Sequence, residues 1–164
     1  MTSTQNFSPA DHGYLQQAID LAVANAEHGG GPFGAVIVKG EEMISTGQNH
    51  VTRDNDPTAH AEVTAIRSAC ATLGTFSLAG ATLYSSCEPC PMCLAACLWA
   101  RLDRVIFAAD RHDAAAGGFD DRAFYDQLDQ SPATWTTPLV QQLQPGGETQ
   151  PFQAWLRNAD RTDY

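Results

Sequence analysis

Four of the five cysteines in the chain lie in one short segment, SCEPCPMCLAAC, residues 86–97. Cys87, Cys90, Cys93 and Cys97 have the C-x₂-C-x₂-C-x₃-C spacing with which bacterial ferredoxins hold iron–sulfur clusters. The inner pair, Cys90 and Cys93, can instead supply two ligands of a zinc ion. A redox-active dithiol and a set of buried cysteines without chemistry are two further interpretations. The remainder of the chain has to decide among them.

A second segment, DPTAHAEVTAIR, residues 56–67, adds a histidine and a carboxylate. His60 and two thiolates make three ligands, so a tetrahedral zinc keeps its fourth position for water, as catalytic sites do. Glu62 follows the histidine closely enough to exchange a proton with that water without being a ligand. The iron–sulfur interpretation is disfavoured because Leu98 stands where the ferredoxin run has proline. A redox dithiol leaves both His60 and Glu62 unexplained.

The elements that position these residues can be predicted from hydrophobic periodicity and from glycine and proline. In chain order we expect a helix over 10–28, two strands within 34–51 around a turn at 39–42, a helix from near Thr58 to Gly74, a strand over 81–86, a helix from Pro91 to residue 100 and a strand over 104–110. Helices are also expected within 120–130 and 151–160. Alternating strands and helices predict an α/β fold with helices on both faces of a sheet. The cysteine segment and the segment with His60 and Glu62 then both lie at helix starts, where thiolates are stabilised.

Composition limits the partners and the compartment. The net charge is −10 and Lys39 is the only lysine, which argues against a nucleic acid and favours a small, neutral substrate. No apolar run is long enough to span a membrane, and the N-terminal residues do not resemble a signal peptide. An odd number of closely spaced cysteines indicates a reducing compartment, so we expect a cytoplasmic protein. The length suggests one domain, residues 1–164.

The order His60-Ala61-Glu62, then Pro89-Cys90-x-x-Cys93 after residues 63–88, resembles the zinc-dependent cytidine-deaminase-like superfamily. The resemblance covers about residues 10–130 and implies a three-layer α-β-α fold with a mixed sheet of about five strands. It also implies one Zn²⁺ per chain, held by His60, Cys90 and Cys93, with Glu62 as the proton-transferring catalytic residue. Within the superfamily the chain is most similar to the bacterial guanine deaminases, through GPFGAVIV, DPTAHAEVTAIR, SCEPCPMCLAA and DAAAGGFDD.

This resemblance implies hydrolytic deamination of guanine to xanthine and ammonia, and it implies a set of substrate contacts. Asn49 supplies an amide and one of Asp120 and Asp121, preferably Asp121, a carboxylate for the purine edge, because such a pocket rejects bases that lack those groups. Phe33 stacks on the purine, and the backbone N–H of Ala61 orients the ring or the attacking oxygen. A homodimer is expected, possibly domain-swapped, in which residues 131–164 with Tyr164 close the partner's site.

Three alternatives remain at this point. A deaminase of cytosine, a nucleoside or an aminotriazine shares the zinc residues and differs at Asn49 and Asp121. A tRNA adenosine deaminase needs a basic groove, whereas the segment DRHDAAAGGFDDRAFYDQ is acidic. A non-catalytic zinc protein needs a fourth protein ligand, for which Cys87 is the nearby candidate.

Overall fold

The computed structural model describes residues 6–164 and contains one mixed sheet of four strands in the order β2-β1-β3-β4. The strands are β1 (Gly31–Lys39), β2 (Glu42–Asn49), β3 (Ala81–Cys87) and β4 (Arg104–Ala109). β1 is antiparallel to both β2 and β3, whereas β3 and β4 are parallel, with Cys87 opposite Ala109 at their carboxyl ends. The chain reverses tightly between β1 and β2, as the sequence predicts.

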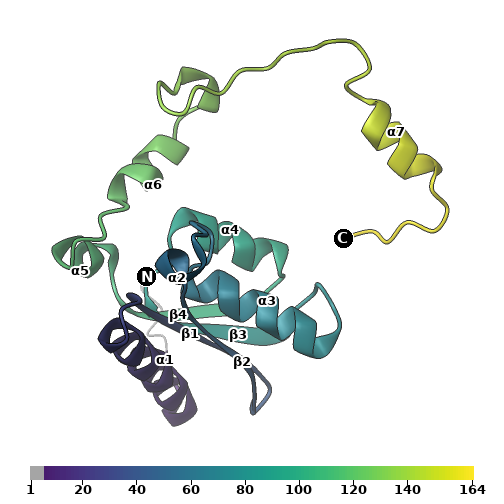
Figure 1. The fold of residues 1–164 in the computed structure, drawn as a ribbon. Coiled ribbons are helices and arrows are strands. Elements are labelled where there is room, and N and C mark those ends of the chain that lie inside the picture. Colours follow the sequence, from purple (N-terminus) through teal and green to yellow (C-terminus); the bar gives the residue numbers. More distant parts are fainter. Residues whose placement is uncertain (1–5) are drawn as a thin grey trace. The chain divides into compact units, whose positions relative to one another are not determined.

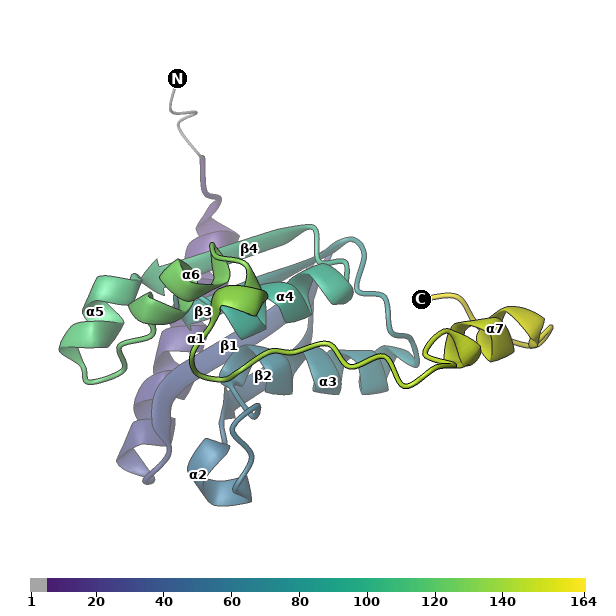
Figure 2. The same ribbon diagram turned by 90° about the horizontal axis from the view of Figure 1, so that it is seen from above.

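Helices cover both faces of this sheet. α1 (Pro9–Glu27) lies on one face, and α3 (Ala61–Leu73) and α4 (Pro91–Trp99) lie on the other (Figure 1). The expected three-layer α-β-α fold is confirmed, but the described residues form four strands and not about five. The difference arises after β4, where the chain enters the helix α5 (Arg111–Ala116) within two residues instead of returning to the sheet (Figure 2).

β1 is the central strand of the hydrophobic core. Ala35 and Ile37 pack among residues of α3 and α4, and Val36 and Val38 pack against the α1 side. All four side chains are buried because successive residues of a strand point to opposite faces and both faces are covered. The continuous apolar run AVIV is therefore a strand that is covered on both faces, as the sequence predicts.

The helix that carries His60 begins later than the sequence predicts. A short helix, α2 (Val51–Asp54), precedes it, and α3 starts at Ala61 and not near Thr58. Asp56 Oδ1 accepts hydrogen bonds from both the backbone N–H and the hydroxyl of Thr58, at 2.8 and 2.7 Å. This local turn competes with helix formation, so the helix begins only after it.

Contacts divide the chain into two compact units, the first ending at Arg122 and the second comprising Ala123–Tyr164. The helix α6 (Arg122–Leu128) begins at this boundary, and the second unit also contains a 3₁₀ turn, η1 (Pro132–Thr134), and α7 (Gln150–Arg157). The predicted helices within 120–130 and 151–160 are thus present in shortened form. Within the described part of the chain, no helix combines the length and hydrophobicity that crossing a membrane requires.

The start of α1 is fixed to the sheet by a buried carboxylate. Ser8 and Asp11 form a capping box, and Asp11 Oδ1 also accepts from the Tyr84 hydroxyl at 2.7 Å and from Arg104 at 3.3 Å. The bond from Tyr84, followed by that from the Ser8 backbone N–H, holds the pKa of Asp11 well below its usual range. One charged side chain therefore joins α1, β3 and β4.

We expect Asp11→Asn to lower the free energy of unfolding by about 2 kcal/mol near neutral pH, the order of a charge-assisted hydrogen bond. The folded-state pKa is depressed, so this stabilisation is present above the unfolded value of about 4 and decreases as pH falls below it. Urea unfolding at pH 7 and pH 3 measures the difference from wild type. Asp20→Asn, on the exposed face of the same helix, is the control and should show no such pH dependence; an equal Asp11→Asn effect at both pH values contradicts the prediction.

Candidate metal and catalytic site

Three side chains from two helix starts come together on the α3–α4 side of the sheet. His60 Nδ1 lies 3.6 Å from Cys90 Sγ and 3.5 Å from Cys93 Sγ, and the two sulfur atoms are 3.5 Å apart. A ligand atom from each residue lies within 4.8 Å of the others, so one ion can be reached by all three. Two thiolates and an imidazole are ligands that zinc prefers, and three protein ligands are the number that catalytic zinc sites use.

The local sequence explains this convergence. His60 is the N-cap residue of α3, and Cys90 is the N-cap residue of α4, with Pro91 in its first turn. α3 packs so close to β2 that a Cβ atom at Gly47 would clash with the backbone oxygen of Ala61. Glycine at this position therefore lets the first turn of α3 lie close against the sheet, near the carboxyl end of β3.

The three donors are electrostatically coupled. Hydrogen bonding with Cys93, and then with the His60 ring, lowers the pKa of Cys90 to about 4. The interaction with the Cys90 thiolate in turn raises the pKa of His60. The same thiolate also raises the pKa of Cys93, which keeps its proton. A group of donors that already favours one thiolate is suited to a cation, which takes the place of the remaining proton.

Glu62 is buried beside these donors without belonging to them. Its side chain accepts a 3.0 Å hydrogen bond from the Ser85 hydroxyl at Oε1, and the Cys93 thiol lies 3.4 Å from Oε2. Burial is the largest influence on Glu62 and raises its pKa. A carboxylate with a raised pKa binds and releases a proton more readily near neutral pH, as a general acid–base group must.

Two of the four clustered cysteines do not contribute to this group. The metal donors found among the described residues do not include Cys87 or Cys97. Cys87 Sγ lies 3.8 Å from the backbone oxygen of Asp110, and Cys97 packs in the core between the sheet and α4. Burial raises the pKa of Cys87 to about 11 and that of Cys97 to about 12, so both are neutral thiols. A closed four-ligand site therefore has no support in this geometry.

Asn49 and Ala61 lie near the donors on neighbouring elements. Asn49 ends β2 and is buried; its Oδ1 accepts from the Val51 backbone N–H at 3.3 Å, and its backbone oxygen accepts from Asn25 Nδ2 at 2.8 Å. Both hydrogen bonds found for Asn49 among the described residues are accepted by its oxygen atoms. Ala61, fully buried at the first position of α3, presents its backbone N–H where intrahelical partners are lacking.

The two neighbouring aspartates differ in their surroundings. Asp120 is exposed, forms a bidentate ion pair with Arg122 at 2.7 and 2.6 Å, and accepts a hydrogen bond from the Arg122 backbone N–H at 3.2 Å. Arg122 lowers the pKa of Asp120 to about 2. Asp121 is half-buried, and burial and then the nearby Cys90 thiolate raise its pKa. These contacts account for Asp120, whereas Asp121 is the one of the two aspartates whose pKa is raised by burial and by the Cys90 charge.

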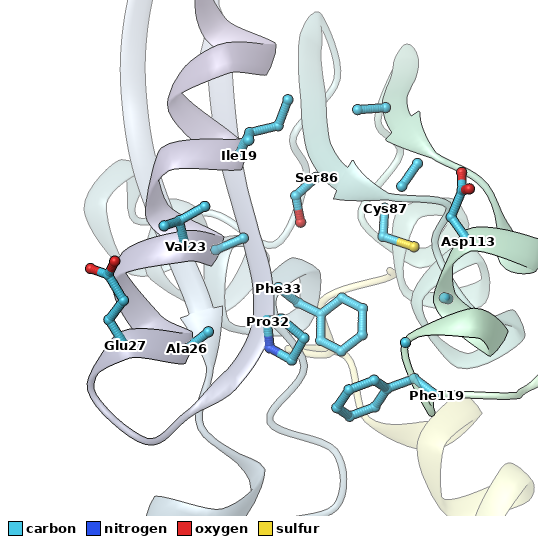
Figure 3. A pocket seen from close by; sticks show the side chains of 15 residues that line it. Ile19, Val23, Ala26, Glu27, Pro32, Phe33, Ser86, Cys87, Asp113 and Phe119 are labelled. Carbon is cyan, nitrogen blue, oxygen red and sulfur yellow. The ribbon is translucent and has the colours of Figure 1, made fainter.

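Phe33 lies at the mouth of an apolar cavity of about 520 Å³ between α1 and the residues that follow β4 (Figure 3). Its ring meets the edge of Phe119 at a centroid distance of 5.0 Å. Ser86 and Cys87 point into the cavity, but none of the metal donors lines it. Tyr164 belongs to the second unit, where its ring packs against that of Trp155 at 6.1 Å.

Four residues near the site were not predicted from the sequence: Ser85, Phe119, Glu88 and Arg111. Ser85 has only a weak signal, since it is one of two adjacent serines, with Ser86, at the end of the strand that precedes the C-x-x-C segment. The others depend on which elements meet in space. Their spacing in the chain follows no period that could reveal them.

Comparison with known proteins agrees with this geometry. Residues 8–109 match the family described as the cytidine and deoxycytidylate deaminase zinc-binding region. A guanine deaminase of Bacillus subtilis (strain 168) is 50% identical over 152 residues, which are 92% of this chain and 97% of that protein. A tRNA-specific adenosine deaminase of the same strain is 42% identical over 99 residues, 60% of this chain and 62% of that protein.

Solved structures of guanine deaminases also resemble this chain. The X-ray structure of guanine deaminase from Bacillus subtilis superimposes with a TM-score of 0.90 at 49% identity and covers 93% of this chain and 98% of that one. A guanine deaminase from Nitrosomonas europaea superimposes with a TM-score of 0.64 at 31% identity and covers 71% of this chain and 66% of that one. The first likeness extends well beyond the zinc-binding region.

Proposed function

Because the chain belongs to the family of the cytidine and deoxycytidylate deaminase zinc-binding region, we infer that it is a zinc-dependent hydrolase that deaminates guanine to xanthine and ammonia. The observation that carries the reaction type is the buried carboxylate of Glu62 beside the three donors His60, Cys90 and Cys93. Likeness to a guanine deaminase over 92% of the chain carries the choice of substrate. The match to a tRNA-specific deaminase covers less of the chain, and the net charge of −10 disfavours RNA.

Zinc fits this site by its donor set, and we propose that His60, Cys90 and Cys93 hold it. When bound there, zinc acts as a Lewis acid that makes water a competent nucleophile near neutral pH. The side chains of the protein provide the proton transfers. The raised pKa of Glu62 and its bond from Ser85, which fixes the carboxylate orientation, support its role in both of them.

In the proposed reaction Glu62 takes one proton from water and gives it to ring nitrogen N3 while the water oxygen bonds to C2 of guanine. A tetrahedral carbon results. Glu62 then transfers the second proton of the water to the amine, the C2–N bond breaks, and ammonia leaves as C2 becomes the carbonyl carbon of xanthine. Guanine and water are consumed, and xanthine and ammonia are formed, so no oxidant or further reactant is needed.

Asn49 and Asp121 are proposed to read the edge of the base, and the backbone N–H of Ala61 to orient it. Guanine presents N–H donors, which the Asp121 carboxylate can accept, and a carbonyl, to which Asn49 Nδ2 can donate. The half-buried position of Asp121 near Cys90 supports this role. Phe33 is proposed to contact the purine face at the rim of the site.

We expect Asp121→Asn to raise KM for guanine about 10- to 100-fold, because one charge-assisted hydrogen bond to the substrate is lost. Asp120→Asn is the matched control, since it changes the adjacent residue by the same atoms and removes only an exposed ion pair, which contributes little. Steady-state kinetics on both variants decide the assignment. If Asp120→Asn carries the larger KM effect, the roles of the two aspartates are reversed.

We further propose a cytoplasmic homodimer in which the second unit, Ala123–Tyr164, closes the site of the partner. The five cysteines are free thiols, which suits a reducing compartment. On α7, Phe152, Trp155 and Leu156 share one face at i, i+3 and i+4, and Phe152 and Leu156 are 70% and 65% exposed. An apolar face of this kind is typical of a helix that packs against another surface.

Mixing two inactive variants tests this arrangement. Glu62→Gln lacks the proton-transferring group, and a chain ending at Thr149 lacks α7 and Tyr164. If tails close partner sites, a co-refolded mixture forms heterodimers in which one site combines an intact Glu62 with an intact tail, and up to about a quarter of wild-type activity returns under random pairing. Tyr164→Phe with the full tail is the milder control. A mixture as inactive as its components shows that each tail serves its own chain or none.

A further inference from the structure

An ion pair links the zinc-ligand loop to the segment that carries Asp121. Glu88 lies two residues before Cys90, and Arg111 is the first residue of α5. Arg111 Nη2 donates to Glu88 Oε1 at 2.6 Å, and its Nε and backbone N–H both donate to Oε2 at 3.0 Å. Three charge-assisted bonds fix the direction as well as the distance between the two elements.

The backbone reinforces this connection. The Glu88 N–H donates to the Ala109 oxygen at 2.8 Å, which continues the parallel pairing of β3 and β4 past Cys87. Asp110, the N-cap residue of α5, forms a capping box with Asp113 and fixes the first turn of the helix. The beginning of α5 is therefore attached both to the strand end and to the loop that leads into Cys90.

The far end of the same segment is attached to β1. Phe119 packs edge-to-face on Phe33, as Figure 3 shows, and Asp121 follows two residues later. The segment that leads to Asp121 is thus held at its start by Glu88 and, two residues before Asp121, by Phe33. Burial and the Cys90 thiolate have the largest influence on the pKa of Asp121, and the charges of Arg111 and Glu88 act on it more weakly.

We propose that Glu88 and Arg111 are positioning residues that set the distance between the zinc-ligand loop and the Asp121 carboxylate, and thereby determine which aminopurine is presented to Glu62. This inference rests on the proposed role of Asp121 in guanine binding. Neither Glu88 nor Arg111 needs to touch the substrate. Because misplacement of a reacting group by about 1 Å can cost about 100-fold, a loosened α5 is sufficient to change the choice of base.

Arg111→Met removes the ion pair and keeps the length of the side chain, and Arg111→Lys keeps the charge without the planar fork. The matched control is Arg104→Met, which removes another arginine–carboxylate pair, to Asp11, on the α1 side of the sheet. Zinc content, thermal unfolding, and kcat and KM are measured for each full-length zinc-loaded protein. The two substrates are guanine and 2,6-diaminopurine, which lacks both the 6-carbonyl and the ring N1–H donor that a carboxylate can accept.

For Arg111→Met we expect KM for guanine to rise about 10- to 100-fold with kcat changed less than about threefold, the size of one lost charge-assisted interaction. The preference for guanine over 2,6-diaminopurine should fall, zinc content should stay at the wild-type value, and Arg111→Lys should recover part of the KM. Arg104→Met should lower the unfolding temperature and leave both KM values unchanged.

The double variant Arg111→Met/Asp121→Asn separates this inference from the proposed function. A KM no higher than that of Asp121→Asn alone supports positioning through Asp121, and a multiplied KM overturns it. An unchanged KM in Arg111→Met, or a loss of activity that follows loss of zinc, also overturns it. If Asp121→Asn itself leaves KM unchanged, the assignment of Asp121 in the proposed function fails, independently of the outcome for Arg111.

Discussion

Glu62→Gln is expected to lower kcat for guanine by about 10³- to 10⁴-fold while zinc content and the unfolding temperature stay close to wild type. Glutamine has the shape of glutamate and keeps an oxygen that can accept the 3.0 Å bond from Ser85, so the fold at this point is preserved. Its amide cannot take a proton from water or return one to the base. The loss therefore belongs to the chemical step.

Ammonia release and the ultraviolet spectrum of xanthine measure this rate, and metal analysis gives the zinc content. Ser85→Ala is an informative companion variant, because it removes the hydrogen bond that orients Glu62 and leaves the carboxylate in place. We expect a smaller loss there, about tenfold, the equivalent of one hydrogen bond. A near-normal rate in Glu62→Gln would remove this residue from the mechanism.

The second large effect is expected on removing a metal donor. Cys90→Ala leaves His60 and Cys93, and a site with two donors should retain less than about a tenth of the zinc of wild type, with activity falling in proportion. A chelator should remove activity from the wild-type protein, and added Zn²⁺ should restore it there but not in Cys90→Ala. The unfolding temperature should fall in both cases, since an ion bound only by the folded state stabilises that state.

Cys87→Ala and Cys97→Ala are the matched controls for this experiment. Both cysteines are buried thiols of the same SCEPCPMCLAAC segment and lie outside the donor group. We expect each variant to keep its zinc and its activity. Cobalt substitution adds an independent count, because the thiolate-to-metal absorbance should indicate two sulfur ligands. Three sulfur ligands, with zinc lost in Cys87→Ala, would mean a closed structural site and no catalysis.

Much of the fold and the central chemistry could be predicted because both depend on local features of the chain. The run AVIV, the glycines after residue 28 and Pro91 specify a buried strand, a helix end and a helix start within a few residues of themselves. His60, Glu62, Cys90 and Cys93 sit at helix starts, so their types and spacing were sufficient to predict which side chains converge. The sheet has four strands where about five were expected, because the chain enters α5 directly after β4. The start of α3 lies later than predicted, because the Asp56 turn precedes it.

The sequence by itself thus determined the three candidate metal donors, the carboxylate of Glu62 beside them and the layers that support them. Only the tertiary structure decided that Ser85 donates to Glu62, that Phe119 packs on Phe33, and that Glu88 binds Arg111. The physical reason is the range of each effect. Helix capping and strand alternation act between near neighbours in sequence, whereas these contacts join elements whose approach is set by strand register and by the close packing of helices on the sheet.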